Sequence, residues 1–141
     1  MEQGNEKLAA DWMAYARLGP DNASEQVYVD GWELVEIARE NPAGAWEAIK
    51  VIVDYYPEPE YHSCNKTEAQ SVVGLMAAGP LEDVLSAHGT RFIGFVETEA
   101  RRDRRMARAL GGVWRSGMPE EIWMRVQQAA DYSYWKRTSA G

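Results

Sequence analysis

The chain has 141 residues, 45% of them hydrophobic and 11% aromatic, and a formal net charge of −7. This composition is typical of one packed domain, and no run approaches the ~18 apolar residues that a membrane span needs. One cysteine, Cys64, excludes an internal disulfide, and the first residues lack the basic and then apolar order of a secretory signal. We therefore expect a single soluble domain over residues 1–141, located in the cytoplasm.

Charge is distributed unevenly along the chain. Residues 1–100 hold 18 Asp or Glu and 6 Lys or Arg, whereas residues 101–141 hold 4 and 9. An acidic protein is repelled by nucleic acid unless it concentrates positive charge on one face. Nucleic-acid binding would therefore depend on the basic run from Arg101 to Arg108.

Apolar residues recur with helical spacing in the first part of the chain. The first helix is predicted around 5–18 and ends at Gly19-Pro20, and the second is predicted over roughly 25–40. Asn41-Pro42 has the form of a cap followed by a proline at the first helical position, and it predicts a third helix to about residue 56. No run shows the alternation of a strand.

The next segment, 57–65, contains two prolines and no periodicity, so a long internal loop is predicted there. Thr67-x-x-Gln70 resembles a capping box and opens a fourth helix that ends near Ala78. Further helices are predicted over about 80–88, 90–102, 104–111 and 119–134, with a flexible tail at 136–141. The expected fold is all-α, a stack of antiparallel helical hairpins with about seven or eight helices.

The junction Ala77-Ala78-Gly79-Pro80-Leu81-Glu82-Asp83 carries several helix-end signals. Gly79 suits the left-handed position just past a helix, and Pro80 suits the first position of the next one. Glu82 and Asp83 then oppose the positive end of that new helix, and His88 favours its negative end. The pattern predicts that one helix stops and another starts at once.

Several of these motifs together resemble a known family. They are Asn41-Pro42-x3-Trp46-x2-Ile49, the block Ala78-Gly79-Pro80-Leu81-Glu82-Asp83-x-Leu85-x2-His88-Gly89, Glu99-Ala100-Arg101-x-Asp103, and Ala109-Leu110-Gly111-Gly112-Val113-Trp114. Over about residues 32–127 the chain is similar to a family of small bacterial proteins classed as a domain of unknown function. Met106 stands where members usually carry an aromatic residue. The resemblance implies a bacterial, helical, cytosolic protein and brings no activity or ligand.

Glu82, Asp83 and His88 are the nearest approach to a catalytic cluster, because a carboxylate and an imidazole are common acid and base partners. Glu82 and His88 are six residues apart, about 9 Å of helical rise, which argues against direct pairing. Helix capping is the favoured interpretation of these residues, and a functional surface is the alternative.

His62 and Cys64 offer two potential metal ligands, but a structural zinc site requires four ligands. A nucleophilic Cys64 would need a base and oxyanion donors that the spacing does not supply. We expect no metal, no cofactor and no catalytic residues.

The run from Arg101 to Arg108 has five arginines in eight residues. By their i, i+3, i+4, i+7 spacing, four of them share one helical face: Arg101, Arg104, Arg105 and Arg108. This face could bind phosphate or RNA, contact an acidic protein, or pair internally with the acidic half of the chain, and the last is favoured.

Six tryptophans are many for this length, and helical spacing places most of them in the core. Trp135 is expected to be the most exposed, beside Tyr132 and Tyr134. Because Trp and Tyr are enriched at interface hot spots, this C-terminal segment is the favoured contact surface, and folding back onto the first helix is the alternative.

The leading functional hypothesis is a non-enzymatic protein that acts through protein–protein contact, such as an immunity or inhibitor protein of a bacterial competition or phage-defence system. Its acidic surface would mask a basic target site. The alternatives are a nucleic-acid or phosphate-binding module that uses the Arg101–Arg108 face, and an enzyme built around Glu82, Asp83 and His88.

Overall fold

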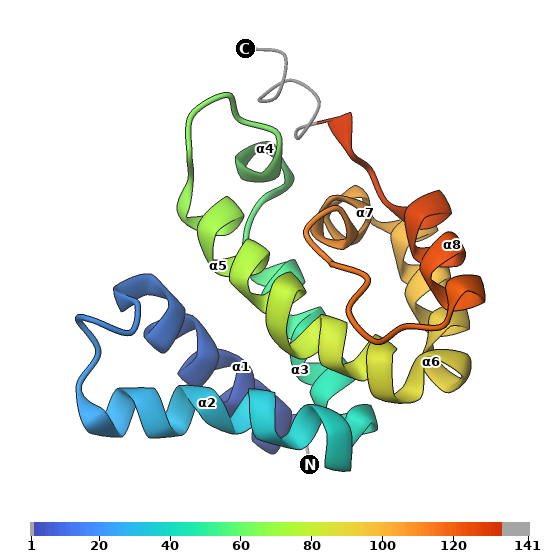
Figure 1. Cartoon of the computed structure of the whole chain (residues 1–141). Coiled ribbons are helices and arrows are strands. Elements are labelled where there is room, and N and C mark those ends of the chain that lie inside the picture. Colours follow the sequence, from blue (N-terminus) through green and yellow to red (C-terminus); the bar gives the residue numbers. More distant parts are fainter. Residues whose placement is uncertain (1, 134–141) are drawn as a thin grey trace.

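The computed structural model describes residues 2–133, and within that range every regular element is helical (Figure 1). The predicted all-α fold is confirmed. Residues 134–141, which include Tyr134, Trp135 and the predicted tail at 136–141, lie outside the described residues.

Three helices form the N-terminal part: α1 (Glu2–Leu18), α2 (Glu25–Glu40) and α3 (Pro42–Tyr55). Gly19, with φ 80°, adopts the left-handed conformation that ends α1, and its N–H donates to Tyr15 O. The predicted cap Asn41 accepts a hydrogen bond from Gly44 N at the start of α3. These helices therefore begin and end where local sequence signals place them.

The segment predicted as a loop over 57–65 contains one helical turn, α4 (Glu58–Tyr61). Pro59 lies at the start of this turn, where its missing N–H costs nothing, so the prolines that indicated a loop also permit the turn. The predicted capping box is confirmed at the start of α5 (Glu68–Met76), where Thr67 and Gln70 bond each other's backbone N–H.

The prediction for the junction after α5 is wrong. Residues Ala77–Leu81 form a π-helical turn that joins α5 directly to α6 (Glu82–Arg102), and Gly79 is not left-handed. Pro80 lies inside this turn. Its ring would clash with the carbonyl four residues earlier in an α-helix, and a wider π turn relieves such a clash without ending the helix. His88, with φ −135° and ψ 29°, kinks α6 near the predicted break.

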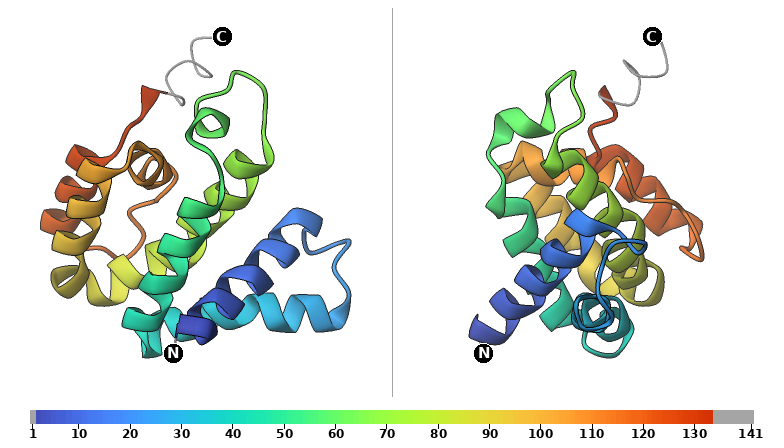
Figure 2. Two further views of the ribbon diagram at one scale, coloured as in Figure 1. Left: turned by 180° about the vertical axis from the view of Figure 1, so that it is seen from behind. Right: turned by 90° about the vertical axis from the view of Figure 1, so that its left-hand side faces the viewer.

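Two more helices complete the described chain, α7 (Arg104–Leu110) and α8 (Glu120–Ala129). The last helix is shorter than predicted. Figures 1 and 2 show α3 and α5 in the middle of the molecule, with the α1–α2 hairpin on one side and α6, α7 and α8 on the other.

One hydrophobic core runs through all these elements. Among its fully buried side chains are Leu34, Ile49, Ile52, Met76, Leu85, Ile93 and Leu110. Trp12 and Trp46 are buried as predicted, whereas Trp114 is 72% exposed. The 111–118 loop therefore places a large aromatic side chain on the surface of the molecule.

Candidate functional site

Glu82 binds the 111–118 loop, whereas Asp83 and His88 both bind Arg39 of α2. Glu82 Oε1 accepts a hydrogen bond from Trp114 N (3.0 Å), and Asp83 Oδ1 accepts one from Arg39 Nη2 (3.2 Å). His88 Nε2 donates to Arg39 O at the end of α2 (2.6 Å), since a carbonyl can only accept. Within residues 2–133 no hydrogen bond joins His88 to either carboxylate. The three side chains hold α2 and the 111–118 loop against α6.

The four arginines expected on one helical face do not share one. Asp103, with φ −138° and ψ 112°, interrupts the helix between α6 and α7, so the helical phase on which that prediction rests is lost. Arg101 is exposed at the end of α6, while Arg108 is only 8% exposed within α7. The prediction of a single arginine face is therefore wrong.

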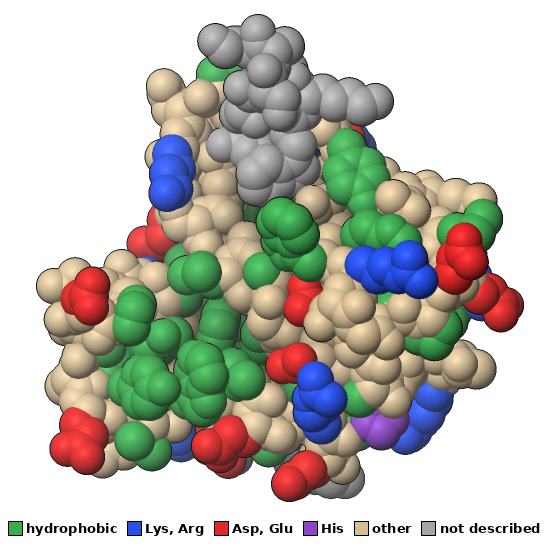
Figure 3. Space-filling model, viewed as in Figure 1, with side chains coloured by type: hydrophobic (Ala, Val, Ile, Leu, Met, Phe, Trp, Pro, Cys, Tyr) green, Lys and Arg blue, Asp and Glu red, His purple; other side chains and the backbone are tan. Residues whose placement is uncertain are grey.

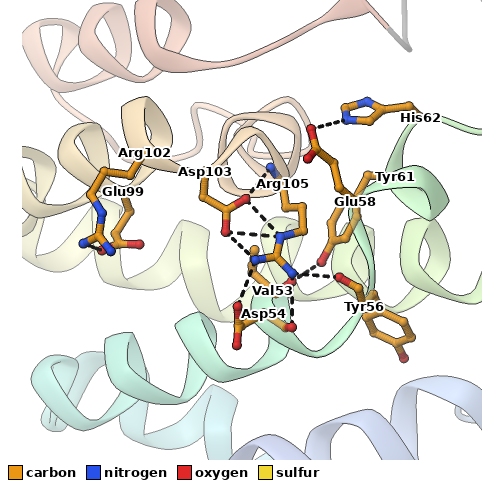
Figure 4. Close-up of polar contacts among 10 residues, drawn as sticks. All are labelled: Val53, Asp54, Tyr56, Glu58, Tyr61, His62, Glu99, Arg102, Asp103 and Arg105. Atoms are coloured by element: carbon orange, nitrogen blue, oxygen red, sulfur yellow. Dashed lines mark hydrogen bonds and ion pairs between the residues drawn. The ribbon is translucent and has the colours of Figure 1, made fainter.

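Arg105 forms the most extensive polar network in the described part of the chain, drawn in Figure 4. Its Nε and Nη2 donate to the Asp103 carboxylate, Nη2 also donates to Asp54 Oδ1 (2.8 Å), and Nη1 donates to the carbonyls of Asp54 and Tyr56. Those carbonyls lie at the C-terminal end of α3, where a helix leaves acceptors unsatisfied. Arg105 thus clamps α3 to α7 and has no donor left for a ligand.

The electrostatics of this clamp follow from its geometry. Burial alone would raise the pKa of Asp103, but the hydrogen bonds from Arg105 outweigh it and leave the pKa of that carboxyl lowered. The same hydrogen bonds, which Arg105 donates to Asp103, raise the pKa of the Arg105 guanidinium. The clamp is therefore a charged structural unit.

Three further arginines of this region are also engaged. Arg102 pairs with Glu99 (3.1 Å) and Arg104 with Glu58 (3.7 Å). Arg108 Nη2 donates to His62 Nδ1 (2.7 Å), which leaves the proton of a neutral ring on Nε2, 3.5 Å from Glu58. Cys64 is exposed, and within the described residues no group of three or more His, Cys, Asp or Glu could hold a metal ion.

A different surface, on α2, carries unpaired charge. Five of its side chains follow one another at spacings of three or four residues and are all exposed: Glu25, Val29, Glu33, Glu36 and Glu40. Within the described chain, none of the four glutamates forms an ion pair. Tyr28 and Trp32 flank this stripe, and we call the seven residues the α2 face.

Aromatic rings stiffen the α2 face. Tyr28 stacks on Trp32, with ring centroids 5.5 Å apart and planes at 11°, and both rings meet Tyr15 of α1 edge to face. Tyr28 is 40% exposed and Val29 54%. Figure 3 shows hydrophobic side chains gathered over the α1–α2 hairpin with acidic side chains around them. This is an exposed aromatic patch bordered by negative charge.

A second surface is a groove of about 990 Å³ between α5, α7, the 111–118 loop and α8. Two of the predicted contact residues, Arg108 and Tyr132, line the groove. Leu75 and Trp114 also line it, and their side chains are 49% and 72% exposed. The chain thus brings together Arg108 and Tyr132 but places the other described candidates elsewhere.

Sequence reasoning missed both surfaces. The helical stripe of α2 predicts Trp32 in the core, yet this side chain is only partly buried. The helical spacing of residues 25, 29, 33, 36 and 40 could have indicated the α2 face. A tryptophan directly after the Gly111-Gly112 helix break could have indicated an exposed ring at the groove.

Comparison with known families gives one result. A family model described as a family of unknown function, DUF6869, matches residues 19–134. The chain belongs to DUF6869. Searches of curated proteins and of solved structures give no match. The matched range includes the α2 face and the groove of this DUF6869 member, but the family description attaches no activity to either. Within residues 2–133 no helix is both long and apolar enough to cross a bilayer.

Proposed function

We propose that this DUF6869 protein is a non-enzymatic interaction protein whose α2 face binds a basic surface of a partner protein, in the manner of an immunity or inhibitor protein. The observation that carries the proposal is the row of exposed glutamates, none of which forms an ion pair within residues 2–133, beside the Tyr28–Trp32 stack. Carboxylates that are not neutralised within the chain are available to Lys and Arg of another protein.

The aromatic rings supply the second element of an interface. Tyr and Trp are enriched among interface hot spots because they bury large area at low entropic cost. Here Tyr15 supports both rings from α1, so they are ordered before a partner arrives. Acidic residues would set the orientation and rate of association, and the aromatic stack would slow dissociation.

The geometry gives less support to the two other functions. The arginines from 102 to 105 are engaged with carboxylates of the chain, which leaves little free charge for a phosphate backbone. Glu82, Asp83 and His88 bind backbone groups or Arg39, not one another. Neither arrangement favours a nucleic-acid module or an acid–base catalyst.

Site-specific crosslinking in the native host tests the proposal. A photo-crosslinking amino acid at Val29 of the α2 face is compared with the same amino acid at Phe95, which is similarly exposed on α6. We expect Val29 to capture a specific protein that Phe95 does not, and mass spectrometry identifies it. Absence of a Val29-specific partner would contradict the proposal.

Calorimetry with the purified partner then tests charge. Glu33→Lys combined with Glu36→Lys is expected to raise Kd at least about tenfold. Glu120→Lys with Glu121→Lys changes net charge equally on the exposed start of α8 and is expected to leave Kd within about threefold. Equal losses in both variants would show that net charge, not the α2 face, determines binding.

A further inference from the structure

The groove between α5 and α8 differs from the rest of this acidic protein in its charge. Its charged lining side chains are Lys66, Arg108 and Arg115, and no described Asp or Glu lines it. The whole chain has 22 acidic residues and 15 basic ones. A concave apolar wall concentrates the field of the cations that line it, so the groove attracts negative charge even though the molecule as a whole repels it.

Carboxylates beside the groove are already engaged. Glu82 accepts the hydrogen bond from Trp114 N, and Asp131 accepts one from Ser133 N. Lys66, in contrast, is exposed and forms no ion pair among the described residues. A positive charge is therefore available at the mouth of the groove.

The apolar part of the groove indicates the kind of ligand. Val73, Ala109 and Val113 are buried in its floor, while Leu75 and Trp114 remain largely exposed along it. A small molecule in an enclosed site is covered on most of its surface. An open groove with exposed Leu and Trp matches instead an extended polypeptide, whose side chains cover those residues.

We propose that this groove binds a short acidic peptide segment of a partner protein, in which a bulky apolar side chain packs against Leu75 and Trp114 and a carboxylate pairs with Lys66. This site is separate from the α2 face and opposite in charge preference. The chain's own last residues, 134–141, contain Lys136 and Arg137 and no acid, so their charge does not match the groove.

The test is selection from a phage-displayed library of random 12-residue peptides on the whole protein, with counter-selection against Trp114→Ala. Any peptide bound to the acidic α2 face is basic and binds both proteins, so counter-selection removes it. We expect the remaining peptides to be enriched in Asp or Glu next to aromatic or leucine residues. No enrichment, or enrichment in Lys and Arg, would overturn the proposal.

Fluorescence anisotropy with the most enriched labelled peptide gives the second readout. Trp114→Ala and Lys66→Glu should each raise Kd at least about tenfold, and amidation of the peptide's carboxylates should do the same. Phe95→Ala and Arg91→Glu, exposed positions on α6, serve as controls and should change Kd less than about threefold. Circular dichroism establishes that each variant is folded. Equal effects in the groove and control variants would overturn the proposal.

Two other occupants give distinct results. If a chain ending at Ser133 binds the peptide at least about tenfold more tightly, residues 134–141 occupy the groove, and the proposal is wrong. If the wild type self-associates with concentration and Trp114→Ala does not, the occupant is a second copy of the chain, which also overturns it.

Discussion

Gly31 lies where α2 crosses α1, and no side chain fits there. A Cβ atom at this position would lie 2.4 Å from Tyr15 Cβ and 3.0 Å from Asp11 O, so one of the helices would have to shift. We expect Gly31→Ala to lower the free energy of unfolding by about 1–3 kcal/mol, the usual cost of overpacking. Urea denaturation measures this change.

Gly79 provides the matched comparison at the residue scale. A Cβ atom added to Gly79 would meet nothing within 4 Å, and its φ is not positive. Gly79→Ala should therefore be neutral or raise the free energy of unfolding by up to about 1 kcal/mol, because alanine loses less entropy in a helical conformation. A loss above about 1 kcal/mol would show that the π turn needs glycine.

The two glycines show what local sequence can and cannot predict. Gly79-Pro80 has the form of a helix end, but the chain stays helical through a π turn in which Ala77 and Leu81 are buried in the core. Gly31 looks unremarkable in sequence, because the constraint on it comes from Tyr15, in another helix. Propensity describes a residue's own backbone, whereas packing depends on distant residues.

At the scale of elements, the Arg105 clamp joins α3 to α7. Arg105→Gln removes a mostly buried charge from Asp103 and leaves the Asp54 and Tyr56 carbonyls without their donor. We expect a loss of about 2–3 kcal/mol at pH 7. Arg101→Gln is the control: the one hydrogen bond of this side chain within residues 2–133 is to Thr98, and the change should alter stability by less than about 0.5 kcal/mol.

The effect of Arg105→Gln should depend on pH. Because the pKa of Asp103 is lowered from its ordinary 3.8, the ionised carboxylate stabilises the wild type above that pH, and this contribution is lost as the pH falls through the lowered pKa. The difference between wild type and variant should therefore be constant from about pH 5 to 7 and shrink below about pH 4. A difference that stays constant down to pH 2 would contradict a charged clamp.

Element boundaries follow the local signals where caps are present. The predicted 25–40 matches α2, and Asn41 and Thr67 cap the helices that they were expected to open. The clamp itself could not be predicted, because Asp54 and Tyr56 are about fifty residues from Arg105 and meet it only after α3 and α7 pack together. Helical periodicity carries no information about such a pairing.

The whole molecule has a charge of −7, and Arg102, Arg104 and Arg105 of its arginine-rich segment pair with carboxylates of the chain. We therefore expect no binding of duplex DNA or single-stranded RNA at about 150 mM salt in gel-shift assays. Tight binding that weakens steeply with salt would instead establish phosphate contacts and favour the nucleic-acid function.

The all-α class of the whole molecule was predictable because helical spacing recurs in nearly every segment. The α2 face and the groove were not predictable, because the burial of each aromatic ring depends on which helices cover it. Trp12 and Trp46 are covered on packing, while Trp114 follows the Gly111-Gly112 break and lies on a loop outside the core. Sequence alone treats the three as equivalent.

The exposure of Trp114 has a spectroscopic consequence. An indole that is 72% exposed emits at longer wavelength than the buried Trp12 and Trp46 and is open to collisional quenching by iodide or acrylamide. Subtracting the emission of Trp114→Ala from that of the wild type separates its signal from that of the other five tryptophans. Trp114 is therefore an intrinsic fluorophore of the groove. A ligand that binds there and covers the indole should shift the Trp114 emission to shorter wavelength and reduce its quenching by iodide or acrylamide.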